Sequence, residues 1–202
     1  MIFLKHKGFS IIEIIIAIAI FSLISAGVFT LGSDIFKLNN TVQDGFNSQE
    51  EAKKIIRPMS NEIRTASQSN LGAYPILQTA TSSFSFFSDI DSDGLKEQVR
   101  YFLSSSTLKK GVVKPTGNPL SYSGSEVITE MIHGVRNSSS TPIFEYYDST
   151  YTGTSTPLSE PVSSVFVRLV KITVVYDINP NRTPIQQTIT TQVSLRNLKD
   201  NL

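Results

Sequence analysis

Residues 5–33 read KHKGFSIIEIIIAIAIFSLISAGVFTLGS, a short basic segment followed by one glycine and a long apolar run. The run from Phe9 to Gly32 has 24 residues. As a helix it would be ~36 Å long at ~1.5 Å per residue, which is enough to cross a hydrocarbon core of ~30 Å. We therefore expect a membrane-spanning helix over residues 9–33.

Glu13 is the one charged residue within this run. A charged side chain inside a membrane helix costs at least ~2.5 kcal/mol, and it is normally found there only with a partner or a function. Its position therefore predicts a specific role for this carboxylate.

The arrangement of Lys5, Lys7, Gly8, Phe9 and Glu13 resembles the N-terminal signature of type IV pilins and of the pseudopilins of type II secretion. In that family a prepilin peptidase cuts after a glycine, the new N-terminal residue is N-methylated, and the fifth mature residue is glutamate. The resemblance implies that residues 1–8 are a cleaved leader whose basic charges are Lys5 and Lys7. It also implies that Gly8 precedes the cut, that Phe9 becomes the methylated N-terminus, and that Glu13 acts in assembly.

Three other interpretations of the segment compete with this resemblance. A secretory signal peptide would have a shorter apolar core, although the small residues near Ala17 or Ala26 could imitate its cleavage site. That interpretation leaves Glu13 unexplained. A plain signal anchor, with the basic residues holding the N-terminus in the cytoplasm, is the stronger rival. A lipoprotein is excluded, because the chain has no cysteine to acylate.

Length and charge limit the rest of the chain. The segment 34–202 is the size of one ordinary globular domain, and we expect it to be extracytoplasmic. The formal net charge of the chain is +1, and it has no basic excess of the kind that indicates nucleic-acid binding. Without cysteines, the domain must rely on its core, or on bound ions, for stability.

A helical pattern continues beyond the apolar run. Between Asp34 and Ser67, apolar residues recur near helical spacing with charged residues between them, which predicts an amphipathic second half of one long helix. Pro58 lies inside this pattern, so we expect it to kink the helix or to start a new segment.

Strand patterns follow after Ser67. The segments 83–88 and 97–103 predict a hairpin around the turn sequence DSDG, and 142–147, 165–176 and 188–195 predict further strands. The segment 125–134 fits a short helix or an irregular strand, and 148–164 and 177–184 are expected to be loops. One long helix followed by strands predicts an α+β fold, with the helix packed on an antiparallel sheet. The resemblance to pilins implies the same fold.

Asp89, Asp91 and Asp93 precede Gly94 in a pattern that opens calcium-binding loops. The twelfth position of such a loop should be a bidentate glutamate, but here it is Arg100. The simpler interpretation is a hairpin turn that needs these residue types. We therefore expect no metal or other cofactor, with calcium as the weaker alternative.

Catalytic signatures are missing from the sequence. It has no cysteine nucleophile, no Gly-x-Ser-x-Gly, no His-Glu-x-x-His and no phosphate-binding glycine loop. His133 is expected to be packed or on the surface, and Glu126 and Glu130 fit a solvated face. We therefore do not expect an enzyme.

The resemblance implies a structural subunit of a type IV pilus-like filament or a type II secretion pseudopilus, most similar to minor, J-type pseudopilins. Its implied partners are other pilin or pseudopilin subunits, the prepilin peptidase and an inner-membrane assembly platform. The implied location is the bacterial inner membrane, with a cytoplasmic N-terminus, and then a periplasmic or cell-surface filament. The alternative is a single-pass anchored binding or adhesin domain that does not polymerise, for which Glu13 would have no use.

Overall fold

The computed structural model of the protein describes residues 10–177 and 186–198. The chain divides into two compact units, Met1–Phe46 and Asn47–Leu202, and helix α1 (Ile11–Arg64) contributes to both. The predicted leader charges Lys5 and Lys7 lie outside the described residues, as does most of the predicted loop 177–184.

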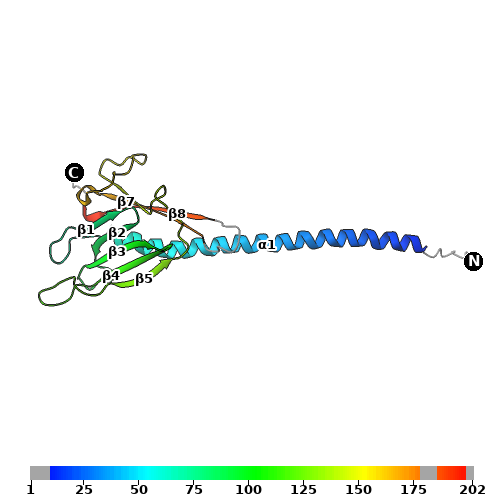
Figure 1. Ribbon diagram of the computed structural model, residues 1–202, viewed down its shortest axis with the longest axis horizontal. Coiled ribbons are helices and arrows are strands. Elements are labelled where there is room, and N and C mark those ends of the chain that lie inside the picture. The colour runs from blue at the N-terminus through cyan, green and yellow to red at the C-terminus, as the bar shows by residue number, and fades with distance from the viewer. Residues whose placement is uncertain (1–9, 178–185, 199–202) are drawn as a thin grey trace, which may run out of the picture. The chain divides into compact units, whose positions relative to one another are not determined.

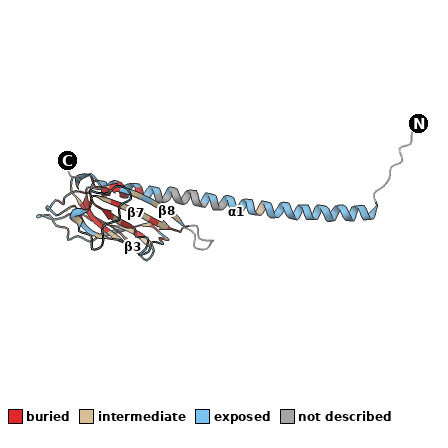
Figure 2. Cartoon of the chain, turned by 90° about the horizontal axis from the view of Figure 1, so that it is seen from above, coloured by how far each residue is buried: buried red, intermediate tan, exposed pale blue. Residues whose placement is uncertain are grey.

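In the first unit, α1 exposes apolar side chains in every direction. Ile11, Phe21 and Phe29 are each more than 70% exposed, and the isoleucines between them are at least half exposed. Figure 2 shows this segment as exposed along its length. A helix that is apolar all round needs apolar surroundings, so this segment requires either a membrane or other helices against it.

In the second unit, the last turns of α1 are amphipathic. Ile56, Met59 and Ile63 are buried at helical spacing, whereas Arg57 and Pro58 are exposed. The helix continues through Pro58. The second of the two predicted outcomes, a new segment that starts at Pro58, is therefore wrong. Because Pro58 is on the exposed face, water can satisfy the carbonyl that loses its intrahelical donor.

The chain leaves α1 through hydrogen bonds to two distant segments. The Ser67 backbone N–H donates to the Phe87 carbonyl at 2.9 Å, which directs the chain towards the strands. The Asn197 side-chain amide donates to the Ala66 carbonyl at 3.0 Å, across 131 positions of sequence. The end of the helix is thus held by residues from both halves of the domain.

The strands form two antiparallel sheets (Figure 1). The five-stranded sheet is a meander in the order β1 (Ile76–Ala80), β2 (Ser83–Ser88), β3 (Glu97–Ser104), β4 (Thr107–Val113) and β5 (Val127–Ile132). The three-stranded sheet has the order β6 (Phe144–Tyr147), β7 (Leu169–Tyr176) and β8 (Gln187–Ser194). Two short 3₁₀ helices, η1 (Ser164–Phe166) and η2 (Arg196–Leu198), flank β7 and β8.

One hydrophobic core joins both sheets to the end of α1. Phe84 of β2 is fully buried, and its ring centroid lies 5.8 Å from that of Phe144 and 5.7 Å from that of Tyr146 in β6. Met59 and Ile63 are part of the same core. The fold is α+β, as predicted, but the helix packs against two sheets where the sequence predicted one.

A buried polar link also ties α1 to the larger sheet. The Tyr101 hydroxyl donates to Glu62 Oε2 at 2.7 Å, and Lys110 Nζ donates to Glu62 Oε1 at 2.6 Å. Burial raises the pKa of Tyr101 well above its ordinary value, and the charge of Glu62 raises it further. The phenol therefore stays protonated and serves as a permanent donor to the helix.

Most predicted strands are confirmed, with three differences. The hairpin of β2 and β3 pairs Ser88 with Glu97, and β8 turns its odd-numbered residues inward as predicted. The segment 127–132 is a strand, so its helical alternative is wrong. The predicted strand 165–176 begins with η1 and becomes β7 only at Leu169. Strands β1 and β4 were not predicted.

Met59→Ala should lower the free energy of unfolding by ~2–5 kcal/mol, because it opens a cavity where the helix meets both sheets. Urea unfolding of the full chain in detergent micelles, followed by tyrosine fluorescence, measures this change. Arg57→Ala on the exposed face of the same turn is the control and should stay within ~0.5 kcal/mol of the parent. Equal losses in the two variants would contradict the packing described here.

Candidate functional site

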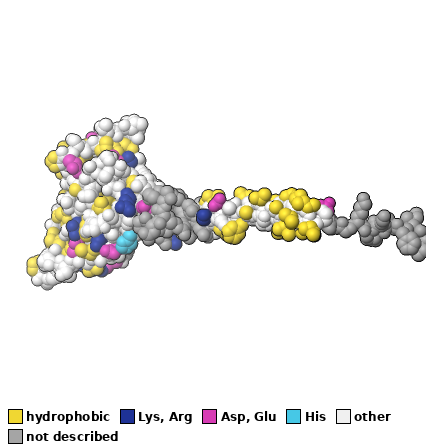
Figure 3. Space-filling view, turned by 45° about the vertical axis from the view of Figure 1, so that its right-hand side comes forward, with side chains coloured by type: hydrophobic (Ala, Val, Ile, Leu, Met, Phe, Trp, Pro, Cys, Tyr) yellow, Lys and Arg dark blue, Asp and Glu magenta, His cyan; other side chains and the backbone are white. Residues whose placement is uncertain are grey.

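The N-terminal part of α1 has the length and composition of a membrane span. Within the described residues, Ile11–Asn39 is the one helical stretch that is long and apolar enough to cross a membrane. It has 29 residues, a mean hydropathy of 2.6 and no buried residue in its most apolar window. Figure 3 shows apolar side chains along this stretch, with an acidic side chain where the described part of it begins. The candidate site is therefore the start of this helix.

Ser10 and Glu13 form a reciprocal hydrogen-bonded cap at the start of α1. Glu13 Oε2 accepts from the Ser10 backbone N–H at 2.8 Å and from the Ser10 hydroxyl at 3.0 Å. The Ser10 Oγ in turn accepts from the Glu13 N–H at 3.3 Å. This is a capping box, in which the Ser10 N–H gains a side-chain acceptor and the Glu13 N–H shares Ser10 Oγ with the Ser10 carbonyl, which is 3.1 Å away.

The cap gives Glu13 a local role beside any role between subunits. Free N–H groups at a helix start carry partial positive charge, so a carboxylate in the first turn is favourable there. In hydrocarbon, where water cannot satisfy these groups, the effect of the cap on stability is larger than at a surface. Ser10 was not among the residues predicted for the site, although the local signature Ser-x-x-Glu in residues 10–13 could have identified it.

The other residues predicted for this site lie outside the described residues. They are Gly8 and Phe9, on either side of the predicted cut, and the leader charges Lys5 and Lys7. Their assignment remains a prediction, as does the assembly role of Glu13.

The remaining predicted residues lie on the second unit. Asp89, Asp91 and Asp93 are in the connection between β2 and β3, where backbone N–H groups of the same loop donate to their side chains. The side chain of His133 is 71% exposed, with its Nε2 3.7 Å from Glu130 Oε2. Its predicted surface position is confirmed.

Glu126 is paired with a base from β3, across the intervening strand β4, and Glu130 is paired with a base from the neighbouring strand β4. Glu126 accepts two hydrogen bonds from Arg100, and Glu130 lies 2.8 Å from Lys109 Nζ. The first pair lies over Gly111, where an added Cβ would clash with the Glu126 carboxylate. The side chain of Glu130 is 51% exposed, in agreement with the predicted solvated face, whereas the side chain of Glu126 is only 24% exposed.

Comparison with known families gives one match. The family model described as the prokaryotic N-terminal methylation motif matches residues 4–29. The match includes the predicted cleavage position, the Ser10–Glu13 cap and most of the apolar helix. No curated protein matches the chain.

The motif and the helix together support a pilin-like protein. The motif is that of proteins processed by prepilin peptidase, and it implies assembly with other pilin subunits. It points to a structural protein and not to an enzyme. With the apolar stretch Ile11–Asn39, it is consistent with a membrane-anchored protein.

Ser10→Ala should speed amide hydrogen exchange in the first turn of α1 about fivefold, because loss of an N-cap side chain costs ~1 kcal/mol. Hydrogen exchange followed by NMR on the full chain in detergent micelles measures this. Ser22→Ala is the control, since Ser22 only donates to the Ala19 carbonyl within the helix. Unchanged exchange at Glu13 and Ile14 in Ser10→Ala would show that the cap does not hold the helix start.

Proposed function

We propose that the protein is a minor pilin or minor pseudopilin, a structural subunit of a type IV pilus-like filament or of a type II secretion pseudopilus. A prepilin peptidase removes residues 1–8, and the mature chain begins at Phe9. The segment 9–33 then serves first as the membrane anchor and later as the filament core, and 34–202 is the extracytoplasmic domain.

One observation carries the proposal: the methylation motif stands at the start of a helix whose apolar side chains have no partner within the described residues. The second unit already contains a complete core, so it does not need this surface for its own folding. A subunit that moves from a bilayer into a bundle of similar helices from other subunits needs an apolar surface of this kind in both places.

The minor subtype rests on the construction of the domain. In its described residues two sheets hold eight strands, and a long segment without strands runs from Asp148 to Ser163 between β6 and η1. Such a broad, loop-rich domain suits a subunit present in few copies, where side-by-side packing of thousands of domains is not required. On this basis we favour the J-type minor pseudopilins that the sequence suggested.

Glu13 would set the register between neighbouring subunits. After cleavage, Phe9 carries a basic α-amino group about one helical turn from Glu13. An axial offset of a few residues between two packed helices would bring the amine of one subunit to the carboxylate of the next. An unpaired charge in such a bundle costs ~3–5 kcal/mol, which makes the pair a strong selector of register.

Location and partners follow from this role. Lys5 and Lys7 would hold the N-terminus in the cytoplasm while the domain faces the other side of the inner membrane. The assembly platform and the other subunits would then extract the helix into a periplasmic or cell-surface filament.

Co-expression with a prepilin peptidase should remove residues 1–8 and leave a methylated Phe9, because the cut has to precede the helix to preserve its span. Intact-mass spectrometry of the purified chain measures both changes. Gly8→Leu is the control and should stay uncut, since a bulky side chain would obstruct the peptidase. A cut near Ala26 in the parent would instead indicate an ordinary signal peptide.

Glu13→Leu should insert and be processed normally but reach filaments at least tenfold less than the parent at equal membrane abundance. The measurement is the subunit content of sheared filaments or pseudopili. Glu13→Gln separates the two roles of this residue, because glutamine retains the capping box with Ser10 but carries no charge.

If the charge pair selects register, both variants should fail to assemble. If only the leucine variant fails, the cap is the important interaction and the register role is wrong. Undiminished incorporation of both would favour the anchored domain that does not polymerise.

A further inference from the structure

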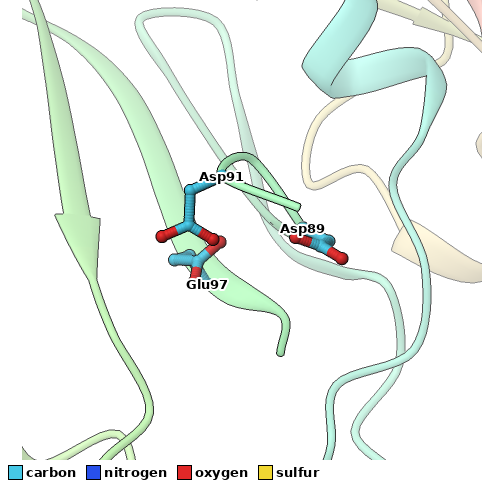
Figure 4. Close-up of side chains that lie close together, drawn as sticks. All are labelled: Asp89, Asp91 and Glu97. Atoms are coloured by element: carbon cyan, nitrogen blue, oxygen red, sulfur yellow. The ribbon is translucent and has the colours of Figure 1, made fainter. Parts of the chain in front are cut away.

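Three carboxylates converge where β2 connects to β3. Asp89 and Asp91 lie in the connection, Glu97 is the first residue of β3, and one oxygen of each lies within 4.8 Å of the other two. Figure 4 shows Asp91 and Glu97 close together with Asp89 beside them. The sequence pattern groups Asp89 and Asp91 with Asp93 and does not indicate Glu97.

Glu97 is the unusual member of this group, because it is 0% exposed. Its Oε2 accepts from the Ile90 backbone N–H at 3.0 Å, but its Oε1 has no hydrogen-bond partner among the described residues. Asp89 Oδ1 is also buried without such a partner in the described part of the chain. An unpaired buried carboxylate oxygen is expensive, so both atoms call for a cation or a donor.

The charges around the three carboxylates sum to a negative value that a divalent cation would neutralise. Lys96 Nζ lies 3.4 Å from Asp89 Oδ2, and Lys114 Nζ contacts Asp91 Oδ2. With Asp93 included, four acids face two lysines, which leaves a formal local charge of about −2. The two lysines lie on Asp89 and Asp91, so Glu97 has no basic partner of its own among the ion pairs of the described residues.

We propose that Asp89, Asp91 and Glu97 bind one calcium ion. Calcium takes oxygen ligands at ~2.3–2.6 Å, so oxygens that all lie within 4.8 Å of one another are within reach of a single ion. Magnesium demands near-ideal octahedral geometry and keeps several of its waters, which suits this irregular connection less well than the flexible coordination of calcium. Backbone carbonyls and water would complete the six to eight ligands that calcium takes.

The loop is organised to present these side chains. The Gly94 N–H donates to Asp89 Oδ2 at 3.1 Å, and Gly94 adopts a φ of 89°, which disfavours other residues there. At the other end, the Lys96 carbonyl accepts from the Tyr122 hydroxyl at 2.6 Å, and the Lys96 N–H donates to Asn70 at 2.6 Å. Calcium would thus stabilise a connection that is already hydrogen-bonded to two other loops.

Glu97 also resolves the incomplete motif in the sequence. Counting Asp89 as the first position, the missing acid is at the ninth position and not at the twelfth, where Arg100 pairs with Glu126. The hairpin is real, but its connection contains a carboxylate cluster that a turn does not require. This proposal does not depend on filament assembly.

The test is thermal unfolding of the full chain in detergent micelles after treatment with a chelator. Calcium chloride at about 5 mM exceeds the ~0.1–1 mM dissociation constants of extracellular calcium modules and should raise Tm by about 5 °C. Magnesium chloride, and sodium chloride at equal ionic strength, should give less than half of this rise. Isothermal titration calorimetry with calcium chloride should give one site per chain.

Two variants make the test specific to the site. Asp91→Asn, on a partly exposed side chain, should fold and lose the calcium-dependent rise. Glu97→Gln should lose the rise too, while its calcium-free Tm should be equal to or above that of the parent because it no longer buries a charge. Glu130→Gln is the matched control, since Glu130 is likewise an acid paired with a lysine, and it should retain the full rise.

Three outcomes would overturn the proposal. One is the absence of a calcium-dependent shift and of calorimetric binding in the parent. Another is an equal shift with magnesium or sodium, which would indicate general screening of charge. The third is a rise that persists in both Asp91→Asn and Glu97→Gln, which would place any bound calcium elsewhere.

Discussion

The structure depends on one constraint, that α1 must satisfy its backbone hydrogen bonds internally wherever water is excluded. A helix does this everywhere except at its ends, where the first N–H groups lack acceptors. The Ser10–Glu13 cap provides acceptors at the end that the membrane would surround. At the other end, the turn after Arg64 is held by backbone and side-chain donors from the domain. A single helix can therefore serve two different environments.

The second environment begins where the side-chain pattern changes. Up to Val42 the apolar residues of α1 are exposed on all sides, whereas from Ile56 onward they occupy one face against the sheets. Glu62 adds a directional contact to that face, because a tyrosine and a lysine from adjacent strands both donate to it. Apolar packing supplies most of the stability here, and the polar link fixes how the helix is rotated against the larger sheet.

Periodicity in the sequence predicted the elements whose structure depends mainly on neighbouring residues. The apolar run, the β2–β3 hairpin and the inward face of β8 all follow from periodicity. Strand β4 was missed because its two-residue turn is Ser105-Ser106 in the left-handed region, without the expected glycine or asparagine. In β5, an exposed edge strand, Val127 and Ile128 are not buried, so alternation gave no signal. Glu97 was missed because its burial depends on distant segments.

The contact between Asn197 and Ala66 has a consequence for the order of events during synthesis. Val193 and Leu195, just before it, are fully buried core residues that follow the end of α1 by more than 120 positions. Helix α1 therefore emerges from the ribosome long before the residues that complete the core around its last turns. Until β8 and Leu195 are translated, Met59 and Ile63 are only partly packed. Under the proposed function, the domain would cross the membrane before its core is complete, and it would depend on holding chaperones more than a domain whose core closes from its N-terminal half.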